Sequence, residues 1–86
     1  MVKLLKFGAN WCAPCRSLVP ILEELKDKVV IEDIDVDEVD HVVLTNYKIR
    51  NIPVLIITKD NVEVWRHVGS ISKIDLENKL KEYETN

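Results

Sequence analysis

Four shortages in this chain of 86 residues restrict what it can do. Two cysteines are too few for the multiple disulfide bridges that stabilise a small secreted scaffold. No apolar run is long enough to span a membrane, and the N-terminus lacks the length and the small-residue cleavage site of a signal peptide. Basic residues are scattered, and a formal net charge of −3 argues against binding nucleic acid through its phosphates. We therefore expect a cytoplasmic protein with no nucleic-acid partner and no membrane contact.

The remaining composition is that of one folded domain. Hydrophobic residues make up 47% of the chain and charged residues 31%, which is too apolar a balance for a disordered protein. The sequence contains no repeat, low-complexity segment or linker. A chain of this length supports a single core, so we assign residues 1–86 to one domain and expect a monomer.

Apolar periodicity and turn residues predict seven elements in the order β-α-β-α-β-β-α. The predicted strands cover residues 2–7, 29–36, 52–58 and 62–68, and the predicted helices cover residues 13–28, 37–48 and 72–83. The first helix carries an apolar stripe and contains Pro20, which should kink it. Asp37 is the predicted N-cap of the second helix, and Ser72 is that of the third.

The order of these elements predicts an α/β fold. Strands joined through a helix pair in parallel by a right-handed crossover, so the first two strands should be parallel. The last two are joined by the short turn "KDN" and should be antiparallel. We expect a four-stranded mixed sheet with helices on both faces.

Cys12 and Cys15 form a CxxC pair, a spacing that occurs both in metal sites and in redox dithiols. A zinc site usually takes four ligands, and the only histidines, His41 and His67, lack the spacing of a ligand pair. We therefore expect no metal site and read both histidines as solvated surface residues. A third alternative, an inert buried pair of thiols, fits poorly with a position at the start of a helix.

The predicted position of Cys12 favours redox chemistry. It precedes the first helix, where unpaired backbone N–H groups and the helix dipole favour a thiolate. Because only the thiolate attacks disulfides, we expect Cys12 to be the exposed nucleophile. Cys15 lies one helical turn later and deeper, where it can resolve a mixed disulfide. Pro14 should stiffen the turn between them, and Trp11 offers a flat apolar surface to a partner.

The stretch "ANWCAPCR" resembles the active-site motif of the thioredoxin family, usually WCGPC. The resemblance covers nearly the whole chain: "YKIRNIPVLI" is similar to the family's segment ending in a cis-proline, "HVGSISK" to its glycine turn before the last helix, and Pro20 to its helix-kinking proline. It implies a minimal thioredoxin fold and a protein-disulfide reductase that needs no bound cofactor. It also implies protein disulfides as substrates and a thioredoxin reductase-type electron donor.

The resemblance further implies a substrate groove around Cys12. In the family a cis-proline bond, here Ile52–Pro53, holds the preceding backbone ready to pair with an extended substrate segment. A trans proline at a strand edge is the alternative. The implied groove residues are Trp11, Ala13, Pro14, Ile52, Pro53, Val68 and Gly69.

The chain also departs from the family pattern. Ala13 replaces the usual glycine, and Gly8 stands where a second tryptophan is common. The N-terminal strand and helix of full-length members are expected to be missing, which would leave one sheet edge less covered. Lys6 occupies the position of a buried aspartate thought to help deprotonate the second cysteine, and Asp33 aligns with a lysine that faces that aspartate in bacterial members.

This charge reversal leads to a hypothesis about Lys6. Kept charged by Asp33, Lys6 would stabilise the thiolate of Cys15, and if neutral it would act as a base. The alternative is that its long stem carries the ammonium group out to water.

Other functions stay open at this point. Glutaredoxin-like enzymes, fed by glutathione, commonly carry CPYC and a paired-glycine turn, whereas this chain has CAPC and the single Gly69. A thioredoxin-fold binding module would not need its dithiol. An oxidant or isomerase would work in an oxidising compartment, and nothing in the N-terminal residues supports export.

Overall fold

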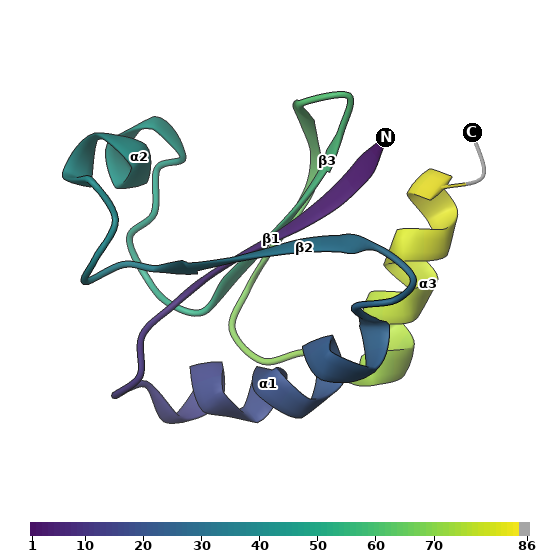
Figure 1. The fold of residues 1–86 in the computed structure, drawn as a ribbon, viewed down its shortest axis with the longest axis horizontal. Coiled ribbons are helices and arrows are strands. Elements are labelled where there is room, and N and C mark those ends of the chain that lie inside the picture. Colours follow the sequence, from purple (N-terminus) through teal and green to yellow (C-terminus); the bar gives the residue numbers. More distant parts are fainter. Residues whose placement is uncertain (85–86) are drawn as a thin grey trace.

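The computed structural model describes residues 1–84, which form seven elements in the predicted order (Figure 1). The strands are β1 (Val2–Gly8), β2 (Val30–Asp35), β3 (Val54–Lys59) and β4 (Val62–Val68), and the helices are α1 (Ala13–Leu25), α2 (His41–Asn46) and α3 (Lys73–Glu84). Within these residues no helix is long and apolar enough to cross a lipid bilayer.

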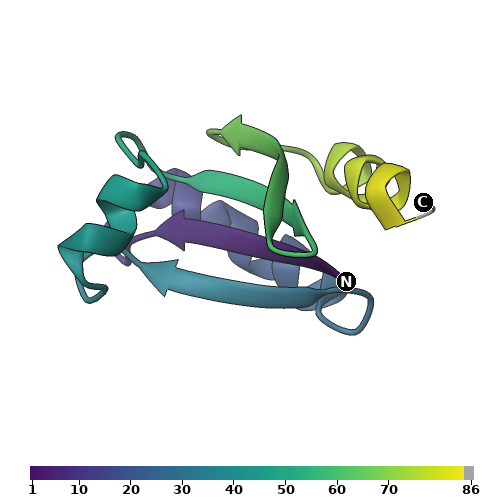
Figure 2. The same cartoon turned by 90° about the horizontal axis from the view of Figure 1, so that it is seen from above.

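The four strands form one mixed sheet in the order β2-β1-β3-β4 (Figure 2). β1 pairs with β2 in parallel and with β3 antiparallel, and β3 pairs with β4 antiparallel. Both strand directions predicted from the connections are therefore confirmed. β1 and β3 are central and almost wholly buried, since each has a strand on either side.

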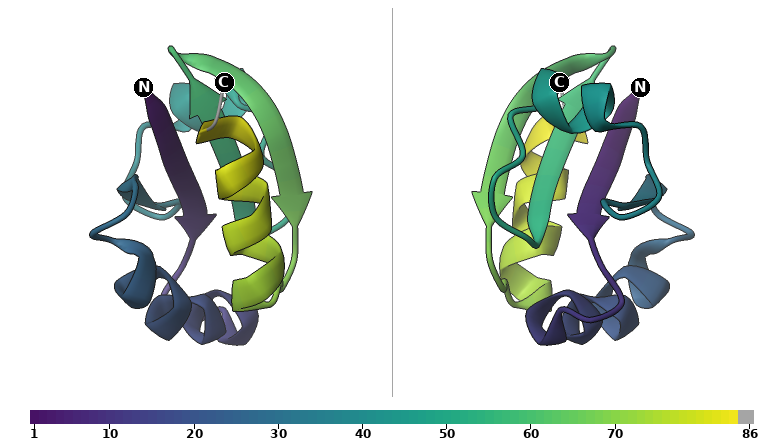
Figure 3. Two further views of the ribbon diagram at one scale, coloured as in Figure 1. Left: turned by 90° about the vertical axis from the view of Figure 1, so that its right-hand side faces the viewer. Right: turned by 90° about the vertical axis from the view of Figure 1, so that its left-hand side faces the viewer.

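The helices cover both faces of the sheet, as predicted. Alternate residues of a strand point to opposite faces, so β1 and β3 contribute to two separate apolar cores. One core joins Leu4, Leu55 and Ile57 to α1 and α3. The other joins Phe7 and Ile56 to partly buried residues of α2. α2 and α3 lie toward opposite ends of the long axis (Figures 1 and 3).

The predicted start of the second helix is wrong. α2 begins at His41, and its N-cap is Asp40, whose Oδ1 accepts a hydrogen bond from the N–H of Val42 at 3.0 Å. Before it, Asp35 Oδ1 accepts from the N–H of Asp37 at 2.8 Å. This side-chain bond closes a turn directly after β2, so Asp37 lies in that turn and the helix begins four residues later.

Other boundaries differ by a few residues. α1 ends at Leu25, whose carbonyl accepts hydrogen bonds from the N–H groups of Lys28 and Val29 in the following turn. β3 begins at Val54 because Pro53 has no N–H to donate to the ladder. The predicted cap of the last helix is confirmed, since Ser72 Oγ accepts from the N–H of Asp75 at 3.1 Å.

β4 contains an irregularity that changes which side chains share a face. Ile57 pairs with Trp65, but the next residue of β3, Thr58, pairs with Glu63, so Val64 is an extra residue. Such a bulge shifts the alternation of side chains along a strand. As a result Glu63 and Arg66, three residues apart, reach each other and form an ion pair.

Candidate active site

Cys12 is the N-cap of α1, directly before its first residue Ala13. Its Sγ accepts a hydrogen bond from the backbone N–H of Cys15 at 3.2 Å. Pro14 lies in the first turn, where a missing N–H leaves no intrahelical bond unmade. The sulfur of Cys12 therefore faces the free N–H end of a helix, which favours negative charge on it.

The two cysteines are joined as a disulfide, so the structure is that of the oxidised protein. Cys15 is 1% exposed and Cys12 is 7% exposed. Cys15 is the deeper of the two, as predicted, but the prediction that Cys12 is exposed is wrong, because it lies in a buried cluster with Cys15. Ala9 is buried in the same cluster, and Ile52 packs against it from the loop before β3.

Ile52 and Pro53 come to the dithiol from the loop that follows α2. The Ile52–Pro53 peptide bond is cis, as the resemblance implied. The carbonyl of Pro53 accepts a hydrogen bond from the N–H of Gly69 at 2.8 Å, which ties this loop to the end of β4. Gly69 has φ +99°, a conformation that other residues rarely adopt.

Exposed apolar side chains flank this point. Trp11 is 67% exposed and Val68 is 53% exposed. Ala13 and Pro14 are also exposed, whereas Ile52 is half-buried and Pro53 is buried. The structure thus brings the implied groove residues to one end of the sheet, while their role in binding stays a prediction.

Asp37 has a different partner from the one predicted. Its Oδ2 accepts a hydrogen bond from the indole N–H of Trp11 at 2.7 Å. The two residues are 26 positions apart but follow the ends of β1 and β2, which are parallel neighbours. The carboxyl ends of parallel strands meet at one edge of a sheet. From this rule the sequence could have predicted that Trp11 and Asp37 lie close together.

Lys6 and Asp33 are neighbours on β1 and β2. Their Nζ and Oδ1 atoms lie 3.6 Å apart, and the lysine side chain is only 6% exposed. The stem of the lysine is therefore covered, and its ammonium group lies beside a carboxylate at the exposed rim of the pair.

A crevice beside α1 connects this ion pair to the dithiol. Its volume is about 220 Å³, and it is lined by Lys6, Gly8, Ala9, Asn10, Cys15, Arg16, Val19, Asp33 and Asp35. A Cβ placed on Gly8 would lie 3.2 Å from Cys15 Sγ and 3.3 Å from Lys6 Cε. A larger residue at position 8 would press on both the buried sulfur and the lysine stem, which would have to shift by a few tenths of an ångström.

The two histidines differ in their surroundings. His41 is exposed, as predicted, but His67 is not a free surface residue. Its ring stacks on Trp65 with a centroid distance of 5.8 Å, and Nε2 lies 2.8 Å from the carbonyl oxygen of Ser70. Across residues 1–84 the structure places no group of three or more His, Cys, Asp or Glu residues to hold a metal ion.

A CxxC disulfide at the start of the first helix, with Ile52 packed against it, defines a thiol-disulfide oxidoreductase. The model of the thioredoxin family matches residues 1–82. The chain therefore belongs to the thioredoxin family, and its activity is dithiol-disulfide exchange.

Curated relatives and solved structures agree with this assignment. Thioredoxin C-2 of Corynebacterium nephridii is 40% identical over 77 residues, which cover 85% of this chain and 70% of that protein. Thioredoxin 1 of Synechococcus elongatus is 37% identical over 84 residues, or 93% and 78% of the two chains. A mutant thioredoxin from Halobacterium salinarum superposes with a TM-score of 0.89 at 32% identity, covering 95% of this chain and 74% of that one.

Proposed function

We propose that the protein is a general reductant of protein disulfides in which Cys12 attacks and Cys15 resolves. The observation that carries this assignment is the Cys12 Sγ at the N-cap of α1, accepting the N–H of Cys15. The same N–H and the helix end would stabilise a Cys12 thiolate in the reduced protein.

The exchange proceeds in two steps. The Cys12 thiolate attacks one sulfur of a substrate disulfide, a mixed disulfide forms, and the other substrate sulfur leaves as a thiolate. The Cys15 thiolate then attacks Cys12 Sγ, and the second substrate sulfur leaves. The substrate gains two electrons and two protons, and the protein is left as the Cys12–Cys15 disulfide described above.

Substrates would dock on the apolar surface around Cys12. The exposed side chains of Trp11 and Val68 flank the dithiol, and the Ile52 backbone, next to the cis bond, would pair with an extended substrate segment. A surface of this kind binds partners through main-chain bonds and apolar contact, which suits many substrates of different sequence.

The remaining parts of the proposal concern the cellular setting. A thioredoxin reductase-type donor would return the disulfide to the dithiol, and the protein would act as a monomer in the cytoplasm. The cytoplasmic setting fits a single redox pair, because a reducing compartment keeps such a dithiol available for substrate.

We further propose that Lys6 assists Cys15 as a positioning residue. The ammonium group lies in the crevice that Cys15 also lines, with Asp33 at its rim. A positive charge near Cys15 would stabilise its thiolate when it displaces the substrate.

Serine variants of the two cysteines test the assignment of roles. Cys12→Ser should abolish insulin reduction in a coupled assay with NADPH and thioredoxin reductase. Cys15→Ser should still attack but remain covalently bound to insulin as a mixed disulfide, visible by mass spectrometry without reducing agent. The reverse pattern would overturn the assignment. Turnover with glutathione in place of the reductase would indicate a glutaredoxin-like enzyme, and biological activity retained by the double serine variant would indicate a binding module.

A further inference from the structure

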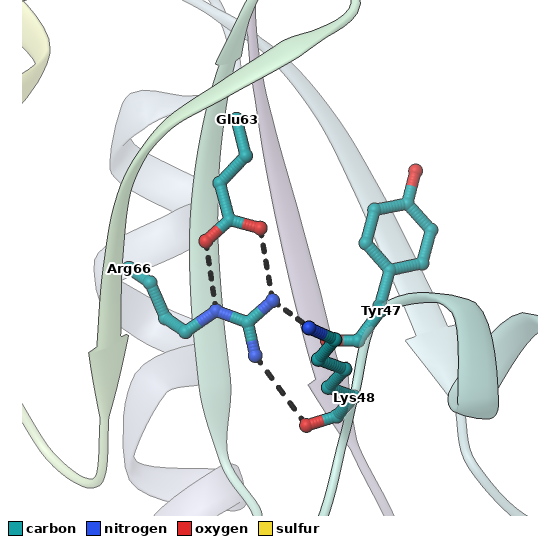
Figure 4. A network of polar contacts seen from close by, with 4 residues as sticks. All are labelled: Tyr47, Lys48, Glu63 and Arg66. Atoms are coloured by element: carbon teal, nitrogen blue, oxygen red, sulfur yellow. Dashed lines mark hydrogen bonds and ion pairs between the residues drawn. The ribbon is translucent and has the colours of Figure 1, made fainter.

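Arg66 of β4 connects two parts of the molecule that are distant in sequence (Figure 4). Its Nε and Nη2 donate to the two carboxylate oxygens of Glu63, each at 2.9 Å. Nη2 also donates to the carbonyl of Tyr47 at 2.6 Å, and Nη1 reaches the carbonyl of Lys48 at 3.5 Å. One guanidinium group thus joins the edge strand to the segment that follows α2.

This contact falls where the chain changes direction. Tyr47 is the C-cap of α2, and its ring packs on Phe7 with a centroid distance of 5.3 Å. Lys48 has φ +57°, in the left-handed region, so the backbone turns sharply here. Arg66 binds the two carbonyls on either side of that turn, which lie beyond the regular bonds of the helix.

The turn opens the loop that carries the groove. Residues 48–53 run from α2 to the dithiol, where Ile52 packs against Cys12 and Cys15. The far end of this loop is held by the hydrogen bond from the N–H of Gly69 to the carbonyl of Pro53. One end of the loop is therefore held by a side chain of β4, and the other by the backbone of Gly69, the residue that follows β4.

We propose that Arg66 is a positioning residue for protein substrates: by holding the start of the 48–53 loop, it sets where the Ile52 backbone lies relative to Cys12. The inference rests on the proposed function, in that it assigns a docking role to the loop. Glu63 accepts from Nε and Nη2 of the fork, while the bonds to the start of the loop are made by Arg66 itself.

The geometry requires arginine and not a positive charge alone. A lysine ammonium can pair with Glu63, but it is a single point and cannot span the carboxylate and both carbonyls. Arg66→Lys therefore keeps the charge and removes the bridge. In Glu63→Gln, by contrast, Arg66 keeps its full set of donors and still reaches the carbonyls of Tyr47 and Lys48.

Two substrates separate docking from reactivity. With insulin, Arg66→Lys should raise KM about five-fold while kcat changes little, because the loop that pairs with the substrate is no longer held in place. With the small disulfide 5,5′-dithiobis(2-nitrobenzoate), which needs no groove, the rate and the pH profile should match those of the unaltered protein. Glu63→Gln should change the KM for insulin less than two-fold.

Amide hydrogen exchange supplies a readout that does not depend on activity. In Arg66→Lys the amides of residues 49–52 should exchange about ten-fold faster, with exchange in β1 unchanged. Arg66→Gln, which lacks the charge, should show the same pattern and serves as a second variant. An unchanged KM for insulin, unchanged loop exchange, or an equal loss with both disulfides would each overturn the inference. Failure of the unaltered protein to reduce insulin would instead overturn the proposed function.

Discussion

The side chain of Lys6 carries an ammonium group, which prefers water, yet it lies in mostly buried surroundings. Its side chain is almost wholly buried, with one carboxylate 3.6 Å away and a buried sulfur beyond Gly8. Long charged side chains are rarely buried without a partner. The exposed rim position of Asp33 allows the pair to keep some contact with solvent, which limits the cost of burying it.

Removing this charge should slow the second half of the reaction. Lys6→Met keeps the volume of the stem but loses the ammonium group, so the Cys15 thiolate would be less favoured. We expect release of the mixed disulfide to slow about ten-fold, and alkylation of Cys15 to need a higher pH. Stopped-flow reduction and pH-dependent alkylation measure the two effects.

Lys3 provides the matched control for that experiment. It lies on the same strand and pairs with Glu32 of β2, with Nζ and Oε1 3.1 Å apart, but it does not line the crevice. Lys3→Met should leave both measurements unchanged. If Lys6→Met also leaves them unchanged, Lys6 has only a structural role.

Asp37 should matter through Trp11. The indole N–H donates to this carboxylate, which fixes the orientation of the exposed ring. In Asp37→Ala the ring loses that bond, and we expect the KM for insulin to rise about three-fold with kcat unchanged. Steady-state kinetics and tryptophan quenching by acrylamide provide the measurement. Glu38→Ala, at the neighbouring exposed position, should have no effect; an equal effect of both would point to charge in general.

For single residues, the sequence predicted some positions correctly and others wrongly. Cys12, Cys15 and Pro14 were predicted correctly in place because their positions depend on a local pattern at a helix start. Asp37 was assigned to a cap because Asp37 and Asp40 both fit that pattern, and only the turn made by Asp35 decides between them.

The edge strand β4 pairs with β3 and also contacts the segment after α2 through Arg66. The bulge at Val64 lets Glu63 and Arg66 meet, and nothing in the alternation of "VEVWRHV" indicates an extra residue. Bulges arise from the fit between paired strands, so the sequence of one strand does not reveal them. Arg66 was for this reason not a candidate site residue.

The Glu63–Arg66 pair should make stability depend on pH. The hydrogen bond from Arg66 lowers the pKa of Glu63 below its ordinary value. A carboxyl group with a lower pKa in the folded state stabilises above its unfolded pKa, and that contribution is lost as pH falls through the folded value. We expect the loss to begin as pH falls toward the ordinary pKa of a glutamate, about 4.3, and to continue below it.

Urea unfolding at several pH values measures this effect. Because the pair is partly exposed, we expect it to be worth less than about 1 kcal/mol. In Glu63→Gln the stability should fall less steeply over the same pH range, whereas Glu38→Gln should follow the unaltered protein. Identical curves for Glu63→Gln and the unaltered protein would show that the pair adds no stability.

The whole molecule is built around two cores that share β1 and β3. Ile56 and Ile57 are adjacent and fully buried, yet they point into different cores, one against α2 and the other against α1 and α3. A domain of this size normally unfolds in one cooperative transition. The shared strands should therefore couple the two cores.

Truncating either isoleucine tests that coupling. Ile56→Ala and Ile57→Ala should each lower the free energy of unfolding by about 3 kcal/mol, since each leaves a cavity next to a central strand. Far-UV circular dichroism and tryptophan fluorescence should report one midpoint in both variants. Separate midpoints in either variant would show that the helices on one face can unfold alone.

The architecture as a whole was predictable because it depends on the order of elements and not on their ends. Strands joined through a helix were predicted to be parallel, and strands joined by a tight turn to be antiparallel. The structure confirms both directions. The joining of the 48–53 loop to β4 was not predictable, since both contacts are made between residues far apart in sequence.

The edge strand β2 carries three acidic residues among six: Glu32, Asp33 and Asp35. An open edge invites pairing with another chain, and charge along it discourages such pairing. Asp33 is therefore both the partner of Lys6 and one of the three negative charges along this edge. A substitution of Asp33 would remove both at once, so its effect on Lys6 has to be separated from its effect on the charge of the edge.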